Sequence, residues 1–200
     1  MIEPLAVAVH AVKQAGDVKG KDVVVIGAGP IGNLVAQTAK GMGARKVMIT
    51  DVSDFRLDIA RQCGIDEVVN TTKEPFGEAM VRVFGPDKAD LIYDCAGNNT
   101  TMGDAIAHAR KGSTIILVAV FAGMATIDLA VANDHELEIK STMMYRHEDY
   151  LDAIRLVEQD RINLRVLVSK RFPFRQYQDA YRYIDEHREQ TMKVLINVQE

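Results

Sequence analysis

Three glycines between residues 27 and 32 stand at a spacing that can bring the backbone close to a phosphate. The motif Gly27-x-Gly29-x-x-Gly32 follows a β-branched run at 22–26 and opens a helical pattern. Gly27 suits a tight turn, the missing side chain of Gly29 leaves room for a pyrophosphate, and Gly32 lets helix and strand pack closely. The helix N-terminus adds unpaired N–H groups for the phosphates. This context predicts a dinucleotide-binding loop, and the alternative is a glycine-rich turn without a ligand.

An acidic residue follows at the end of the next strand pattern. Asp51 comes 19 residues after Gly32, where a carboxylate can accept hydrogen bonds from both hydroxyls of an adenosine ribose. The same charge would repel a 2′-phosphate, so we expect NAD rather than NADP, although Arg56 alone would favour NADP. In the alternative interpretation, Asp51 caps the following turn and Arg56 is a solvated helix residue.

Alternating strand and helix patterns position these residues. Between residues 4 and 120, apolar runs without polar alternation separate amphipathic helices, which is typical of a parallel sheet covered on both faces. We therefore predict a doubly wound α/β fold with strand order 3-2-1-4-5-6. The expected strands are 22–26, 46–50, 67–70, 90–95 and 114–120, and the expected helices are 4–15, 31–42, 55–62, 76–84 and 102–109.

The pattern changes after Phe121. We expect a nucleotide-binding domain at 1–145 and a C-terminal tail at 146–200, and the final strand has the alternation of a half-buried or edge strand that could belong to a different sheet. The expected elements are an extended segment at 125–131, a sixth strand at 138–144, helices near 150–159 and 174–187, and a last strand at 193–198.

The composition of the 200 residues excludes several classes of protein. With 48% hydrophobic and 26% charged residues, a net charge of -4 and no basic run, the chain is typical of a globular protein and not of a nucleic-acid binder. Its apolar runs are too short to cross a membrane, and its start lacks the basic residues of a signal peptide. Cys63 and Cys95 stand alone and the five histidines are scattered. We therefore predict no disulfide, no metal site and a cytoplasmic location.

Several segments together resemble the zinc-dependent medium-chain dehydrogenase/reductase family, in the polyol branch that includes sorbitol and threonine dehydrogenases. The resemblance covers nearly the whole chain and implies a Rossmann domain of an enzyme that oxidises a secondary alcohol by hydride transfer to NAD. The segments that carry it are Glu3-Pro4-Leu5, Gly27-Ala28-Gly29-Pro30-Ile31-Gly32, Thr50-Asp51-Val52-Ser53, Asp94-Cys95-Ala96-Gly97, Val118-Ala119-Val120 and the run from Leu167 to Phe174.

The resemblance also implies roles for single residues. Asp51 and Arg56 would hold the adenosine ribose, and Glu3 would lie beside the metal and the substrate. Tyr145 matches a tyrosine that contacts cofactor or substrate. The other implied cofactor contacts are Pro30 and Ile31 beside the glycine loop, Cys95, Ala96 and Gly97 in the crevice, Val118, Ala119 and Val120 facing the nicotinamide carboxamide, and Met143 and Met144 next to Tyr145.

Two departures from the family pattern matter. Sorbitol dehydrogenases resemble one another in an aromatic-Arg-Tyr run where this chain has Met143-Met144-Tyr145, which argues against sorbitol itself as substrate. The family's zinc ligands and proton-relay residues precede the Glu-Pro-Leu segment. We therefore expect a cofactor-domain fragment with no catalytic residue of its own, whose parent enzyme binds zinc while this chain does not.

The resemblance and the fragment interpretation also predict how the chain self-associates and which apolar surfaces it exposes. The resemblance suggests a homodimer or homotetramer, formed through the extended segments at 125–131 and 138–144. A fragment would also leave two apolar faces without cover, Leu5-Val9-Val12 and Val194-Ile196-Val198.

Two other functions remain open at this point. One is a regulatory Rossmann module that binds NAD(H) outside any dehydrogenase. The other is a methyltransferase that binds an adenosyl ligand, against which the glycine spacing followed by Pro30-Ile31 argues.

Overall fold

A six-stranded parallel sheet forms the centre of the protein. The computed structural model describes residues 1–199 and orders the strands β3-β2-β1-β4-β5-β6, which confirms the predicted doubly wound α/β topology. The strands are β1 Asp22–Ile26, β2 Lys46–Asp51, β3 Glu67–Asn70, β4 Leu91–Asp94, β5 Thr114–Leu117 and β6 Glu138–Ser141.

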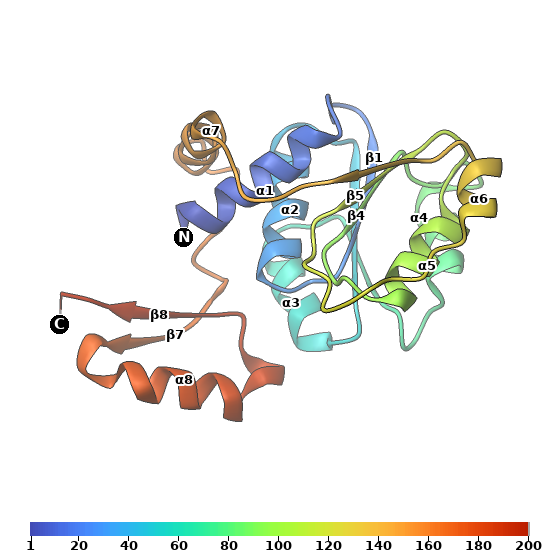
Figure 1. The fold of residues 1–200 in the computed structure, drawn as a ribbon. Helices are drawn as coiled ribbons and strands as arrows, with labels where there is room; N and C mark the ends of the chain where they lie inside the picture. The colour runs from blue at the N-terminus through green and yellow to red at the C-terminus, as the bar shows by residue number, and fades with distance from the viewer. Residues whose placement is uncertain (200) are drawn as a thin grey trace.

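Helices cover both faces of this sheet, so the domain has three layers. Helices α1, α2 and α3 lie on one face and α4, α5 and α6 on the other (Figure 1). Among the described residues, no helix combines the length and apolar character needed to cross a membrane. The helices are α1 Ile2–Gln14, α2 Pro30–Gly41, α3 Asp54–Gln62, α4 Phe76–Phe84, α5 Asn99–His108, α6 Leu129–Asp134, α7 His147–Glu158 and α8 Tyr177–Glu186.

The alternation of side chains along β1 explains why its residues 23–26 are all apolar, whereas Asp22 at its start is buried and pairs with Arg45. Val23 and Val25 pack into the core under α1 and α2, whereas Val24 and Ile26 pack into the core under α4 and α5. All five residues of β1 are buried. The centre of a strand covered on both faces needs a continuous run of apolar residues, because successive side chains point to opposite sides of the sheet.

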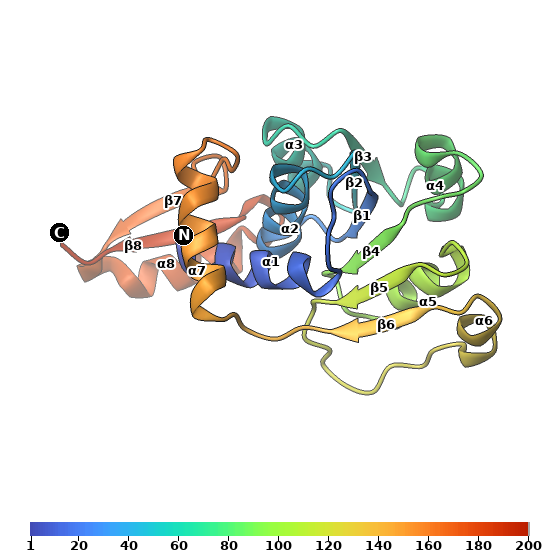
Figure 2. The same cartoon turned by 90° about the horizontal axis from the view of Figure 1, so that it is seen from above.

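Helix α7 returns from the far edge of the sheet and packs on α1, beside the N-terminus (Figure 2). The expectation that the Leu5-Val9-Val12 face lacks cover is therefore wrong, because all three side chains are fully buried beneath neighbouring helices. The contact also has a polar part. His10 Nδ1 lies 2.7 Å from Asp149 Oδ2, and Lys13 Nζ donates to Asp149 Oδ1 across 2.8 Å.

A small second sheet lies apart from the first. Strands β7 Val168–Pro173 and β8 Lys193–Asn197 run parallel and are connected through α8, and in both views this unit lies on the N-terminal side of the molecule (Figures 1 and 2). The expectation that the last strand belongs to a different sheet is confirmed. Its partner β7 was not predicted, because Ser169, Lys170 and Arg171 in its middle are exposed and give no strand pattern. Val198, expected to lack cover, is 75% exposed.

The segment expected to be extended at 125–131 is partly helical, which corrects that prediction. The side chain of Asp128 accepts hydrogen bonds from the amides of Ala130 at 3.0 Å and Val131 at 3.1 Å, and so caps α6. Asp is a strong N-cap residue, and this local hydrogen bonding outweighs the apolar alternation. The sixth strand is present but ends at Ser141, before Met144 adopts a φ of 59°.

Candidate functional site

The glycine-rich loop has the geometry that its spacing predicted. Gly27 has a φ of +98°, which favours glycine, and its amide donates to the carbonyl of Thr50 across 2.7 Å. A Cβ on Gly32 would overlap the carbonyl oxygen of Gly27, so close packing of α2 on the loop requires glycine there. A Cβ on Gly29, the N-cap of α2, would meet no atom within 4 Å. The space beside Gly29 is therefore open to a ligand.

Asp51 ends β2 directly beside this loop. Its side chain is buried, with Oδ2 accepting from the amide of Ala28 at 2.7 Å and Oδ1 accepting from the amide of Ser53 at 2.9 Å. The carboxylate therefore caps the following turn and also contacts the glycine loop. Arg56 Nη1 lies 3.7 Å from Asp51 Oδ2, and the buried Nε of Arg56 has no partner among the described residues. The Arg56 side chain as a whole is 34% exposed, so its guanidinium has further donors for a polar ligand.

These groups face one cleft of about 710 Å³ at the carboxyl ends of the central strands. The cleft joins Gly27, Asp51, Arg56 and Ala96, four residues predicted to bind a cofactor. It also contains residues that the sequence did not single out. In an open parallel sheet, side chains that follow the strand ends line the ligand crevice, and this rule would have found several of them. The unpredicted lining residues include Thr71, Phe76, Asn98, Thr101 and Asp104.

The turn after β4 closes one side of the crevice. Gly97 has a φ of +71°, and a Cβ on it would lie 2.5 Å from the Cβ of Ala119, so the segments 95–97 and 118–120 lie against each other. Burial, with the neighbouring Asp94 charge, raises the pKa of the Cys95 thiol far above its usual range. Burial also raises the pKa of the Cys63 thiol to about 11. Both cysteines are therefore neutral thiols, which are weak nucleophiles.

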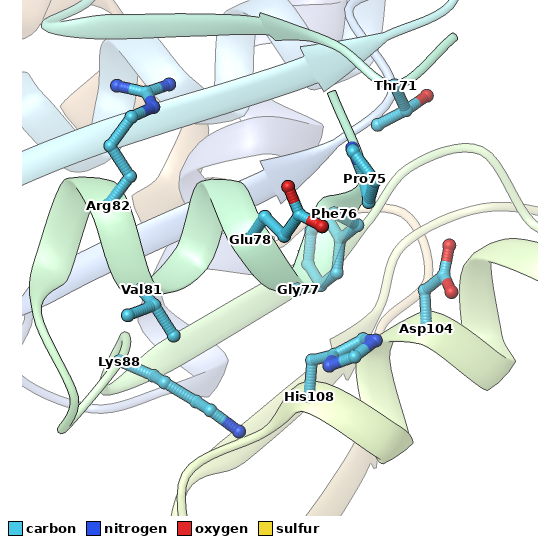
Figure 3. A pocket seen from close by; sticks show the side chains of 10 residues that line it. All are labelled: Thr71, Pro75, Phe76, Gly77, Glu78, Val81, Arg82, Lys88, Asp104 and His108. Atoms are coloured by element: carbon cyan, nitrogen blue, oxygen red, sulfur yellow. The ribbon is translucent and has the colours of Figure 1, made fainter. Parts of the chain in front are cut away.

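A second groove of about 970 Å³ continues from the cleft between α4 and α5 (Figure 3). The two share Thr71, Phe76 and Asp104. The rings of Phe76 and His108 lie 5.9 Å apart at the floor of the groove. A Cβ on Gly77 would overlap the His108 ring, so the two helices are in close contact there.

Several predicted site residues do not line the cleft. Glu3 is exposed near the start of α1, and the Tyr145 ring lies 5.9 Å from the ring of Tyr150 on α7. Met143 and Met144 are 67% and 57% exposed. The roles of these residues toward cofactor or substrate stay predictions, as do those of the other predicted residues that do not line the cleft, Gly29, Pro30, Ile31, Gly32, Cys95, Gly97 and Val118 to Val120.

Zinc does not fit the side chains of this chain. Within residues 1–199, no group of three or more His, Cys, Asp or Glu side chains is placed to hold a metal ion. A catalytic zinc needs about three protein ligands. We therefore assign no step of a reaction to a metal on these residues.

Comparison with known proteins gives one consistent result. A family model described as zinc-binding dehydrogenase matches residues 30–159. Sorbitol dehydrogenase 1 of Saccharomyces cerevisiae is 29% identical over 98% of this chain, and sorbitol dehydrogenase of Homo sapiens is 34% identical over 90%. The crystal structure of a short chain alcohol dehydrogenase from Escherichia coli, complexed with NADH, superposes on 99% of this chain with a TM-score of 0.90 at 26% identity.

The matches cover part of each relative. The chain spans 56% of the yeast protein, 51% of the human protein and 58% of the Escherichia coli chain. It therefore corresponds to about half the length of these relatives.

Proposed function

The chain belongs to the zinc-binding dehydrogenase family, and from this membership we propose that it is the NAD(H)-binding half of an enzyme that oxidises a secondary alcohol. The cleft carries the proposal, because Asp51 and the guanidinium of Arg56 line it as an acceptor and a donor, while Gly29 of the adjoining loop leaves open space at the N-terminus of α2. A dinucleotide presents phosphates, ribose hydroxyls and a base, which are complementary to these three features.

Each residue has a distinct task in this proposal. The amides at the start of α2 bind the pyrophosphate, which approaches over Gly29. Asp51 accepts hydrogen bonds from the ribose hydroxyls, and Arg56 lies over the adenosine side. The carboxylate of Asp51 is already held by the Ala28 and Ser53 amides, so it is positioned before the cofactor arrives and loses little side-chain freedom on binding.

We infer a preference for NAD(H) over NADP(H) from the same carboxylate. A 2′-phosphate would meet Asp51 as a like charge. Two like charges 4 Å apart repel by roughly 4 kcal/mol at an effective dielectric constant near 20. Arg56 offsets part of this repulsion, but its guanidinium lies 3.7 Å from Asp51 and is partly neutralised by it.

The reacting end of the cofactor would lie at the turn after β4. When bound, nicotinamide accepts a hydride from the alcohol carbon. Residues 95–97 and the backbone of 118–120 would hold the ring, with Pro30 and Ile31 packed against the cofactor and residues 143–145 beside it. Glu3 and Tyr145 would approach the substrate, a polyol or a threonine-like alcohol. The zinc of the parent enzyme would be held by residues outside this chain.

We further propose that residues 1–145 form the NAD-binding domain and that residues 146–200 associate with the catalytic half of the parent protein. The parent would be a cytoplasmic homodimer or homotetramer. The edge strand β6 supports self-association, because it pairs with β5 on one side and leaves its other edge open.

Calorimetric titration of the 200-residue chain with NADH, NADPH and S-adenosylmethionine tests the proposal. We expect NADH to bind at least about tenfold more tightly than NADPH, which is about 1.4 kcal/mol, and no binding of S-adenosylmethionine. Binding of S-adenosylmethionine without NADH would favour the methyltransferase. If NADH binds, the coding sequence next to this segment distinguishes the dehydrogenase from a regulatory module, since the dehydrogenase requires a zinc-binding half.

A further inference from the structure

Asp94 has a buried carboxylate to which the proposed cofactor contacts assign no task. It is the last residue of β4, and its side chain is fully buried. Among residues 1–199, no lysine, arginine or histidine forms an ion pair with it. Burying a carboxylate without a cation is costly unless hydrogen-bond donors surround it. The donors around Asp94 therefore indicate what this side chain positions.

Three donors compensate the carboxylate, and all come from the segment that follows β4. Oδ1 accepts from the amides of Ala96 and Gly97, each at 3.0 Å, and Oδ2 lies 3.3 Å from the hydroxyl of Thr101, whose proton is shared with the Asn98 carbonyl at 3.2 Å. The first two bonds fix the turn after the strand. The third connects that turn to the first turn of α5.

The backbone of Asp94 holds the neighbouring strand end as well. Its carbonyl oxygen accepts from the amides of Val118 at 2.9 Å and Ala119 at 3.0 Å. Gly97 lies against Ala119 so closely that a Cβ would not fit between them. The two segments proposed to hold the nicotinamide are thus both tied to one residue. Asp51 is held by other donors, the Ala28 and Ser53 amides.

We propose that Asp94 is a positioning residue for the nicotinamide half of the cofactor. This inference rests on the proposed function. The carboxylate does not touch the cofactor; it holds the backbone at 95–97, and with it the 118–119 segment, at the crevice. Without it, the turn would lose two amide hydrogen bonds and relax, while the adenosine contacts at Asp51 would keep their own support.

The experiment compares two ligands that share the adenosine half. The dissociation constants of NADH and 5′-AMP are measured by calorimetry for the wild-type chain and for Asp94→Ala. We expect NADH to bind at least about tenfold more weakly to the variant, equal to about 1.4 kcal/mol, and AMP less than about threefold more weakly. Asp94→Asn keeps an oxygen for the two amides, so it should stay within about threefold of wild type for both ligands.

The control lies at the opposite end of the same strand. Asp90 precedes β4 and pairs with Arg110 at 2.7 Å. Asp90→Ala should lower the melting temperature without changing the ratio of NADH to AMP affinity. If Asp94→Ala does not fold, Thr101→Val takes its place, and it should weaken NADH more than AMP while Thr101→Ser restores both.

Failure of the positioning role of Asp94 can be distinguished from failure of the proposed function. A folded Asp94→Ala variant that binds NADH as wild type does, or that loses NADH and AMP affinity equally, overturns the positioning role alone. The same holds for equal effects of Thr101→Val on both ligands. A wild-type chain that binds no NADH overturns the proposed function and this inference with it.

Discussion

The amide of Ala28 donates a hydrogen bond to Asp51 Oδ2 across 2.7 Å. The contact joins the loop after β1 to the end of β2, so the carboxylate proposed to accept the ribose and the loop proposed to admit the pyrophosphate keep a fixed separation. Because a carboxylate also has a second oxygen, held by Ser53 at 2.9 Å, the charge of Asp51 can be changed without removing every contact that positions it.

The first prediction concerns cofactor choice. Asp51→Asn keeps an oxygen that can accept from Ala28 but removes the charge. We expect the ratio of NADH to NADPH affinity to fall at least about tenfold, because a 2′-phosphate no longer meets a like charge. Asp58→Asn on α3 is the control, since that exposed carboxylate pairs with Arg61 instead. An unchanged ratio in Asp51→Asn would contradict the assignment of Asp51.

The second prediction separates two glycines of the loop. Gly29→Val should fold, because a Cβ there meets no protein atom, but it should reduce NADH affinity by more than about a hundredfold by filling the space of the pyrophosphate. Gly32→Ala should instead lower the free energy of unfolding, because its Cβ overlaps Gly27. Gly103→Ala, at an open position of α5, serves as control and should lower neither the NADH affinity nor the free energy of unfolding. Undiminished NADH affinity in folded Gly29→Val would remove the pyrophosphate assignment.

The third prediction concerns the contact between α1 and α7. Burial alone raises the pKa of Asp149, but hydrogen bonds from Lys13, the Arg146 amide and His10 outweigh it and hold the pKa below the usual 3.8. A lowered folded-state pKa adds stability above the unfolded pKa, and this stability is lost as the pH falls through the folded value. Asp149→Asn should therefore cost about 1 to 3 kcal/mol at pH 7 and less below pH 3.8.

Urea unfolding at pH 7 and pH 3 measures this difference. Asp152 is the matched control, because it also bonds to Lys13, at 2.6 Å, but its side chain is 30% exposed. Asp152→Asn should cost less than about 1 kcal/mol. An equal cost of Asp149→Asn at both pH values would show that packing, and not the charge, makes the contact.

The fourth prediction concerns metal and turnover. The purified 200-residue chain should retain no stoichiometric zinc after dialysis, because the described residues hold no ligand cluster. It should also form no NADH from sorbitol, threonine or simple alcohols. Elemental analysis measures the bound zinc, and absorbance at 340 nm measures NADH formation. Binding of NADH by the same preparation is the control. Stoichiometric zinc together with turnover would show that the chain builds its own catalytic centre.

The fifth prediction tests the open edge of β6. The amide of Glu138 donates to Ser113, directly before β5, and the amide of Thr142 donates to Leu117 at its end, so the alternation of a parallel strand points the amide of Ser141 away from β5. Ser141→Pro should keep the fold, because Pro is tolerated on an edge strand, but should convert a dimer into a monomer in light scattering. Ser141→Ala should remain dimeric. A wild-type chain that stays monomeric at high micromolar concentration would contradict self-association through β6.

The central sheet could be predicted because burial on both faces leaves a direct mark on sequence. The central strands β1, β2, β4 and β5 contain short apolar runs, and the glycine loop and Asp51 follow from fixed distances along the chain. The exposed strand β7 leaves no such mark, since its polar centre obtains its strand conformation from pairing with β8. At 125–131, apolar alternation predicted an extended segment where the capping side chain of Asp128 starts a helix.

The candidate site, like the fold, could be predicted only in part. Gly27, Asp51, Arg56 and Ala96 were predicted and meet in one cleft. The importance of Asp94 could not be predicted from the residues, because it depends on donors brought together by the turn after β4 and by α5. An aspartate in the sequence does not by itself indicate whether its carboxylate is buried or solvated.

The contact of α7 with α1 has a consequence for synthesis. His10 and Asp149 are 139 residues apart, and ribosomes add about 5 to 20 residues per second. A nascent α1 therefore waits roughly 7 to 28 s before α7 can be made to cover it. During this interval its apolar side chains that face α7 are available to chaperones, and α1, although made before α2 to α8, becomes one of the last of these helices to reach its native packing.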